Sequence, residues 1–181
     1  GITIRPRSSW NVLDPLVVGW RLRGEEHDRV LLDVTELRAA LQPMAAELAA
    51  RNATAEQRER LIELADEIVR TSRRPERTDE LAEAELAFHM LLLRATANEL
   101  FAGFSGVVRL VERLDGPQSP EPGLVWAERY RRIAAAVAAG DGETARIASR
   151  AQVAQGLAGM TARVGERPSI AEPPSSDHWS V

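Results

Sequence analysis

The stretch Leu81-Ala82-Glu83-Ala84-Glu85-Leu86-Ala87-Phe88-His89-Met90-Leu91-Leu92-Leu93-Arg94 decides the fold. Its apolar residues recur at helical spacing, and Phe88 and Leu92 lie on the side that faces a core. Glu85 and His89 fall on the same side, four residues apart. A carboxylate there is costly without a partner. Two interpretations stay open: a buried hydrogen bond between Glu85 and His89, or a cavity in a helical bundle where both hold a metal or a polar ligand.

The composition favours one all-α domain. Of the 181 residues, 44% are hydrophobic but only 4% are aromatic, and the apolar residues are mostly Ala and Leu. Such a composition is typical of close-packed helices, because sheets use more Val, Ile, Tyr and Phe. We therefore expect an antiparallel bundle of about six to seven helices joined by short links.

Charge and residue usage exclude several classes of protein. A net charge of −4 argues against a DNA-binding surface on this chain alone, and we interpret the all-arginine basic set as a coding bias. The absence of Cys excludes disulfides and thiolate metal sites. No apolar run approaches the roughly 20 residues of a membrane span, and no signal peptide begins the chain. We expect a cytoplasmic protein, and the initial Gly1 suggests that an upstream segment has been removed.

Capping signals place the helices. Asp14 followed by Pro15 predicts a short helix to about residue 22, and a long helix is expected over about 35–51. Pro43 should kink the long helix, because proline cannot donate to the carbonyl four residues earlier. The remaining signals are the capping box 54–57, the helix caps Thr78, Asn98 and Asp141, the closing Gly140, a loop over 115–123 and a disordered tail from about Gly165.

The expected core positions repeat every three or four residues in each helix. Arg38 lies at the edge of the stripe of the long helix. The positions are Leu37, Leu41, Met44 and Leu48; Leu61, Leu64 and Ile68; Leu100, Phe104, Val107, Val111 and Leu114; Trp126, Tyr130, Ile133 and Val137; and Ala145, Ala148 and Gln152.

Three segments together resemble the FadR-type GntR regulators. The segment Ile4–Arg7 through Trp10–Pro15 resembles the end of their winged-helix wing and the linker after it. Glu36-Leu37-Arg38 with Pro43, then Leu48-Ala49-Ala50, resembles the first long helix of their FCD effector domain. The later landmarks are Glu85–His89, Ala97-Asn98 and Ala139–Asp141, so the resemblance covers about residues 1–160.

The resemblance implies a dimeric bacterial transcription factor whose winged helix binds operator DNA and whose bundle binds a small metabolite, often a carboxylate or a sugar acid. It divides the chain into a wing remnant, short helix and linker (1–28), an effector-binding and dimerisation domain (29–163) and a tail (164–181). Operator binding would belong to a winged helix that is missing here.

In many members an Asp and three His of the bundle hold a divalent metal. By the resemblance, Glu85 stands at the Asp position and His89 at the first His, while Tyr130 and Gln152 stand at the other two. A phenol and an amide are poor ligands for a transition metal. We therefore expect no tight metal, and at most a weak divalent ion such as zinc at Glu85 and His89.

Arg38 matches a position that in many members reaches the carboxylate of the effector, where a guanidinium offers two parallel hydrogen bonds. A salt bridge at a helix end is the alternative. We expect Arg38, Glu85, His89, Tyr130 and Gln152 to converge on one internal pocket for a small anionic metabolite, with Arg38 and a protonated His89 offsetting the charge of Glu85.

The sequence also allows two rival functions. One is a metal-dependent enzyme that uses Glu85 and His89 as an acid–base pair, but no nucleophile elbow, glycine-rich phosphate loop or third metal ligand supports it. The other is a helical dimerisation or interaction module that binds no ligand. Trp126, close to Tyr130 along the helix, can line the pocket or simply belong to the core.

Overall fold

The computed structural model describes residues 11–74, 76–115 and 123–165, with side chains given for 11–74, 76–111 and 123–165. These residues form helices and no strand, which confirms the all-α prediction. The helices are α1 (Pro15–Leu22), α2 (His27–Asn52), α3 (Ala55–Thr71), α4 (Thr78–Arg94), α5 (Glu99–Asp115), α6 (Leu124–Ala139) and α7 (Gly142–Val164).

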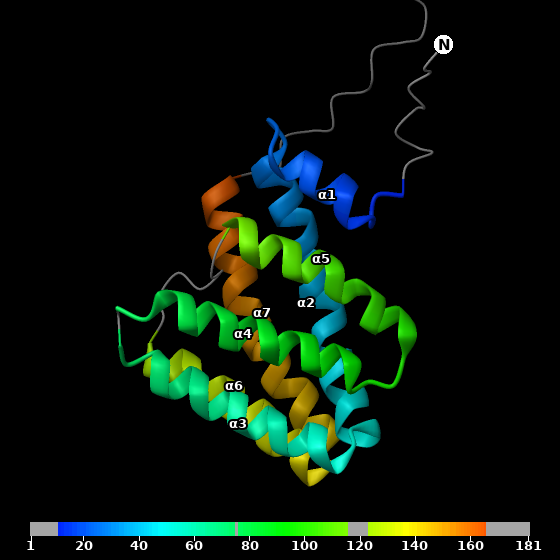
Figure 1. Cartoon of the computed structure of the whole chain (residues 1–181), viewed down its shortest axis with the longest axis vertical. Helices are drawn as coiled ribbons and strands as arrows, with labels where there is room; N and C mark the ends of the chain where they lie inside the picture. The colour runs from blue at the N-terminus through cyan, green and yellow to red at the C-terminus, as the bar shows by residue number, and fades with distance from the viewer. Residues whose placement is uncertain (1–10, 75, 116–122, 166–181) are drawn as a thin grey trace, which may run out of the picture.

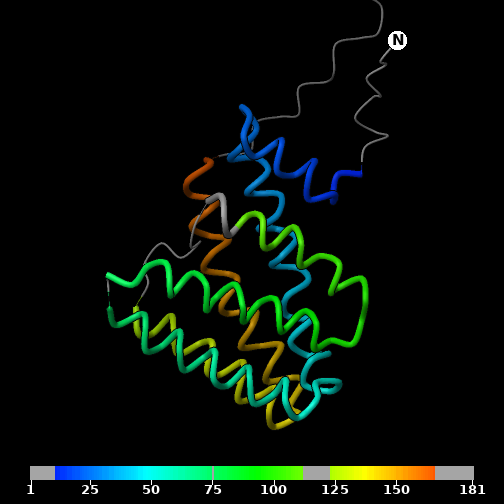
Figure 2. The backbone as a smooth tube through the Cα atoms, in the orientation of Figure 1, coloured from blue at the N-terminus to red at the C-terminus, as the bar shows by residue number. Residues whose placement is uncertain are grey.

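The two longest helices form the spine of the domain. α2 runs away from the N-terminal end of the molecule and α7 runs back beside it, so the two are antiparallel and share the most extensive contact of any helix pair (Figure 1). Across them lie α5, α4 and α3, each antiparallel to its neighbour in sequence, and α6 packs beside α3 (Figure 2). No helix in the described ranges is long and apolar enough to cross a membrane.

The core has two parts, which meet along α2. The first lies among α3, α4, α6 and the C-terminal half of α2, and Phe88, Ile68 and Ile133 are fully buried in it. The second lies among α1, α5, α7 and the N-terminal half of α2, where Leu31 and Val107 are buried. Polar residues near the middle of α2 therefore lie between two apolar clusters.

The prediction for the long helix was wrong at its start and on its buried face. α2 begins at His27, not near Thr35, because Val30, Leu31 and Val34 pack into the second cluster and extend the helix. The expected core stripe is only half-buried at three positions, Leu37, Leu41 and Leu48, and Met44 is 44% exposed. The buried face instead carries polar and small residues: Thr35, Arg38, Gln42, Ala45, Ala46 and Ala49. Small residues there allow the close approach of α7.

Most capping predictions are confirmed. Asp14 accepts from the backbone N–H of Leu16, the box at Thr54 and Gln57 is reciprocal, and Asn98 accepts from Leu100 at the start of α5. Thr78, however, is the first residue of α4 and not its cap. Arg77 holds the cap position and its side chain makes no capping hydrogen bond.

Individual core predictions also differ. Leu100 is 85% exposed, because it lies on the outer side of the first turn of α5. Ala148 is half-buried, and the side chain of Leu114 lies outside the described residues. Pro43 lies inside α2 without ending it, and the kink stays a prediction. The wing remnant in residues 1–10, most of the 115–123 loop and the tail beyond 165 lie outside the described residues.

Candidate functional site

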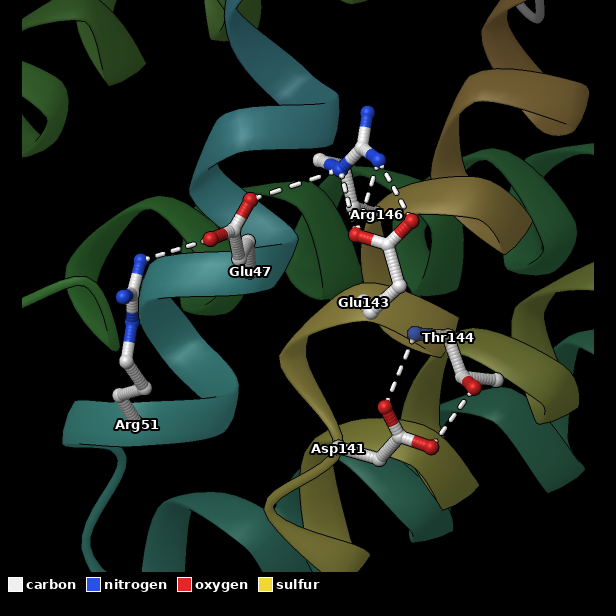
Figure 3. Close-up of polar contacts among 6 residues, drawn as sticks. All are labelled: Glu47, Arg51, Asp141, Glu143, Thr144 and Arg146. Atoms are coloured by element: carbon white, nitrogen blue, oxygen red, sulfur yellow. Dashed lines mark hydrogen bonds and ion pairs between the residues drawn. The ribbon is translucent and has the colours of Figure 1, made fainter.

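The turn between α6 and α7 sets the register of two helices that carry predicted site residues. Gly140 adopts a φ of +74°, a left-handed conformation that favours glycine, and Asp141 caps α7 by accepting from Thr144. Arg146 of α7 pairs with Glu47 of α2 at 3.5 Å, and this pair ties the turn to the spine (Figure 3). Tyr130 of α6 and Gln152 of α7 then lie close enough for their side chains to form a hydrogen bond of 2.9 Å.

All five predicted site residues line one cavity of about 40 Å³ in the middle of the domain. Since a buried water needs about 10–15 Å³ measured in this way, the cavity has room for roughly three water-sized groups. Arg38 comes from α2, Glu85 and His89 from α4, Tyr130 from α6 and Gln152 from α7, and each is at most 8% exposed. The other lining residues are Thr35, Trp126, Val153, Gln155 and Gly156.

Tyr130 is the centre of the polar contacts. Its hydroxyl donates to Glu85 Oε1 at 3.0 Å and lies 3.2 Å from His89 Nε2, while Gln152 Nε2 donates to the phenol oxygen at 2.9 Å. The ring is held edge-on between Phe88 and Trp126, each with its centroid 5.1 Å away. Trp126 therefore belongs both to the core and to the wall of the cavity.

Gln42 of α2 completes the network. Its Nε2 lies 3.1 Å from His89 Nδ1 and donates to Gln152 Oε1 at 3.1 Å. Gln42, His89, Tyr130 and Gln152 thus form a closed ring of hydrogen bonds, named here the polar ring, with one member from each of α2, α4, α6 and α7. Glu85 extends it as the acceptor of the Tyr130 hydroxyl.

The surroundings of His89 favour the neutral imidazole, whereas the protonated form was expected as one that offsets an anion bound beside Glu85. Burial removes water from the imidazole and lowers its pKa well below the usual 6.5, and the nearby positive charge of Arg38 lowers the pKa further. The positive charge that can attract an anion into this cavity therefore comes from Arg38 and not from His89.

The donor set does not fit a divalent metal. Only Glu85 and His89 in this cavity are good ligands, and structural or catalytic zinc uses three or four. In the part of the chain with described side chains, no group of three or more His, Cys, Asp or Glu side chains is placed to hold an ion. Both imidazole nitrogens of His89 already have a neighbour, because Nε2 lies 3.2 Å from the hydroxyl of Tyr130 and Nδ1 lies 3.1 Å from Nε2 of Gln42.

Sequence reasoning missed three polar residues of the site: Thr35, Gln42 and Gln155. Gln42 follows Arg38 by four residues, the same spacing that singled out Glu85 and His89, so the signal was present. Gln155 follows Gln152 by three residues and lines the cavity. Its Oε1 is buried and accepts no hydrogen bond from any described residue. That buried acceptor is a candidate partner for a donor on a ligand.

Comparisons with known proteins identify the family of this chain. The FCD domain model matches residues 33–155, the segment that holds every residue lining the cavity except Gly156. The chain is 26% identical over 145 residues to the uncharacterized HTH-type transcriptional regulator YieP of Escherichia coli, covering 80% of this chain and 63% of that protein.

It is also 25% identical over 113 residues to the galactonate operon transcriptional repressor of the same organism, covering 62% of this chain and 48% of the repressor. The chain therefore spans about half to two thirds of the length of these relatives. Both are transcriptional regulators and not enzymes, so an acid–base role for Glu85 and His89 is not favoured. Placement in the FadR subfamily stays a prediction. The chain belongs to the FCD domain family, the effector-binding part of GntR-family transcriptional regulators.

Proposed function

We propose that this domain binds a small anionic metabolite, such as a carboxylate or a sugar acid, and that binding controls a bacterial transcription regulator. One observation carries the proposal: the guanidinium of Arg38, only 8% exposed, lines a small cavity that is otherwise neutral or acidic. A buried guanidinium is stabilised by an oxyanion that accepts two parallel hydrogen bonds from it.

The remaining predicted residues define the shape of the site. With His89 neutral, Arg38 balances the charge of Glu85, and an added anion depends on Arg38 for its attraction. Tyr130 donates a hydrogen bond to the carboxylate of Glu85, and this bond disperses part of the negative charge that an added anion would meet. The small cavity favours an acid of few carbon atoms, or one end of a larger acid.

A thermal-shift screen of small carboxylates and sugar acids tests the proposal on the wild type and on Arg38→Met, a substitution of similar length without charge. The expected result is an acid that raises the melting temperature of the wild type and leaves that of Arg38→Met unchanged. Arg60→Met, on the exposed side of α3, is the matched control and should respond as the wild type does. An acid that stabilises Arg38→Met equally removes Arg38 from the site, and a silent screen favours an interaction module without a ligand.

We further propose that the domain acts as a cytoplasmic homodimer, as the resemblance implies, through alanine-rich helix faces that permit close packing. Operator DNA would be bound by a winged helix outside this chain, and the net charge of −4 argues against specific DNA binding by the chain alone. Sedimentation at micromolar concentration should give a dimer, and a clean monomer would contradict this. A footprint at a defined operator by this chain alone would contradict the proposal that the chain does not bind DNA specifically.

A further inference from the structure

The direction of each hydrogen bond in the polar ring follows from the donors available. Tyr130 has a single hydroxyl hydrogen, and its hydroxyl contacts Glu85 Oε1, His89 Nε2 and the amide nitrogen of Gln152. A carboxylate can only accept, so this hydrogen goes to Glu85. The other two neighbours, His89 Nε2 and the amide of Gln152, must then both donate to the phenol oxygen.

The same reasoning fixes the rest of the ring. A neutral imidazole that carries its hydrogen on Nε2 has a bare lone pair on Nδ1. Gln42 must therefore present its NH₂ group to His89 Nδ1, and the same nitrogen supplies its second hydrogen to Gln152 Oε1. If the oxygen and nitrogen of the Gln42 and Gln152 amides exchanged places, the single hydroxyl hydrogen of Tyr130 would face three acceptors: Glu85, His89 Nε2 and Gln152. One arrangement of hydrogens therefore satisfies every member of the ring.

We propose that Gln42 is a positioning residue of the pocket: with Tyr130 and Gln152 it holds His89 as the neutral Nε2–H tautomer, so that neither imidazole nitrogen is available to a metal. The inference rests on the proposed function and narrows it. The direct contacts of the ligand come from Arg38 and from the amides of Gln152 and Gln155, while His89 and Tyr130 form a wall cross-linked by hydrogen bonds. Gln42 lies one turn after Arg38 on α2. The polar ring therefore also holds the segment of α2 that carries Arg38 in place relative to the cavity.

Nitrogen-15 spectra of the histidine side chains test the tautomer directly. His89 is assigned by the loss of its signals in His89→Gln. In the wild type at pH 7, His89 should show a protonated Nε2 and a bare Nδ1. Gln42→Glu keeps the shape but can only accept, so a proton should appear on Nδ1. A wild-type His89 protonated on Nδ1, or a Gln42→Glu spectrum identical to that of the wild type, would overturn the proposal.

Gln57→Glu is the matched control, because Glu also serves at this half-buried capping-box position of α3 and the His89 signals should not move. If Gln42→Glu does not fold, the wild-type spectrum still shows which imidazole nitrogen of His89 carries the hydrogen. Zinc titration of the full chain gives an independent readout: the wild type should bind zinc no more tightly than His89→Gln. Zinc binding that is tighter in the wild type than in His89→Gln would show that an imidazole nitrogen of His89 is available to a metal, and would contradict the inference. The nitrogen-15 spectra and the zinc titration are made without any carboxylic acid ligand. If they contradict the inference, the proposed function is still tested separately by the thermal-shift screen of Arg38→Met.

Discussion

The hydroxyl of Tyr130 on α6 lies 3.0 Å from Glu85 Oε1 on α4, and both side chains are at most 4% exposed. This contact joins two helices in the middle of the domain. It gives a buried carboxylate one of the partners that such a group requires, because an ionised group without hydrogen bonds is too costly to bury. The phenol also receives hydrogen bonds from His89 and Gln152, so one oxygen links α6 to both α4 and α7.

Tyr130→Phe should therefore destabilise the domain although it leaves no large cavity. The change removes the donor to Glu85 and the acceptor of two buried N–H groups, and leaving buried polar groups unsatisfied costs about 1–3 kcal/mol each. We expect a loss of about 2–4 kcal/mol in the free energy of unfolding, measured by urea denaturation at pH 7. Thr161→Val removes a hydroxyl on the exposed side of α7 and should cost far less. Equal effects of the two changes would contradict a special role for Tyr130.

Arg58 secures the end of the domain opposite α1. From α3 it donates to the carbonyls of Ala50 and Ala53 at the C-terminus of α2, and to those of Val137 and Ala138 at the end of α6. The last carbonyls of a helix lack partners within the helix, so one guanidinium satisfies the ends of two helices.

Arg58→Met should lower the free energy of unfolding by about 2–3 kcal/mol, since several charge-assisted hydrogen bonds are lost. Arg58→Lys should recover only part of this loss, because an ammonium cannot reproduce the planar fork. Arg60→Met removes only an exposed pair with Glu63 and should change stability by less than about 1 kcal/mol. Chemical denaturation compares the three variants. A loss in Arg58→Met no larger than in Arg60→Met would show that water replaces Arg58 at the carbonyls.

Local signals predicted most of the fold, because caps and apolar spacing act over a few residues. Asp14, Thr54, Gly140 and Asp141 all mark the helix ends that the structure shows. The buried face of α2 could not be read in this way. Apolar spacing pointed to Leu37, whereas the tertiary packing of α7 and the cavity buries Arg38.

The candidate site was predicted by resemblance more than by pattern. Spacing placed Glu85 and His89 on one face, but their alignment with Tyr130 and Gln152 depends on helix packing that no local pattern encodes. Gln42 was missed because a glutamine within a helix is ordinarily exposed. The lowered pKa of His89 could not be predicted from the sequence either, because it depends on the depth of burial and on the nearby charge of Arg38.

The lowered pKa of His89 predicts a pH dependence of stability. The unfolded chain binds a proton near pH 6.5 that the native imidazole does not bind, so the contribution is fully present above pH 6.5 and is lost as the pH falls. The groups that face His89 are Arg38 from α2, Glu85 from α4 and Tyr130 from α6, together with the neutral amides of the ring. The slope should approach about 1.4 kcal/mol per pH unit below pH 6.5.

Urea denaturation between pH 7 and pH 5.5 measures this slope. The window avoids the exposed carboxylates such as Asp141, whose pKa is lowered and whose contribution is lost only at more acidic pH. His89→Gln, which cannot titrate, should show a nearly flat dependence over the same window. A wild-type slope as flat as that of His89→Gln would mean that the native imidazole accepts a proton as readily as the unfolded chain.

Gln155 offers a test of what the ligand carries besides its negative charge. Its buried Oε1 accepts no hydrogen bond from any described residue, and an acceptor left in that state costs about 1–3 kcal/mol. A ligand that donates a hydrogen bond there should therefore bind more tightly than the same acid without the donor. Lactate and propionate form a suitable pair, since they share one carbon skeleton and differ by a hydroxyl, and both are small enough to approach a cavity of about 40 Å³.

We expect the wild type to bind lactate about five- to tenfold more tightly than propionate, the gain of one buried hydrogen bond, when both are titrated by calorimetry. Gln155→Leu should bind the two acids alike and should keep the propionate affinity of the wild type, because the guanidinium of Arg38 is untouched. Gln57→Leu, at a half-buried position in the first turn of α3 and outside the cavity lining, is the control and should keep the preference for lactate. Equal affinities of the wild type for the two acids would show that Gln155 faces water and not the ligand. Loss of both acids in Gln155→Leu would assign it to the shape of the pocket instead.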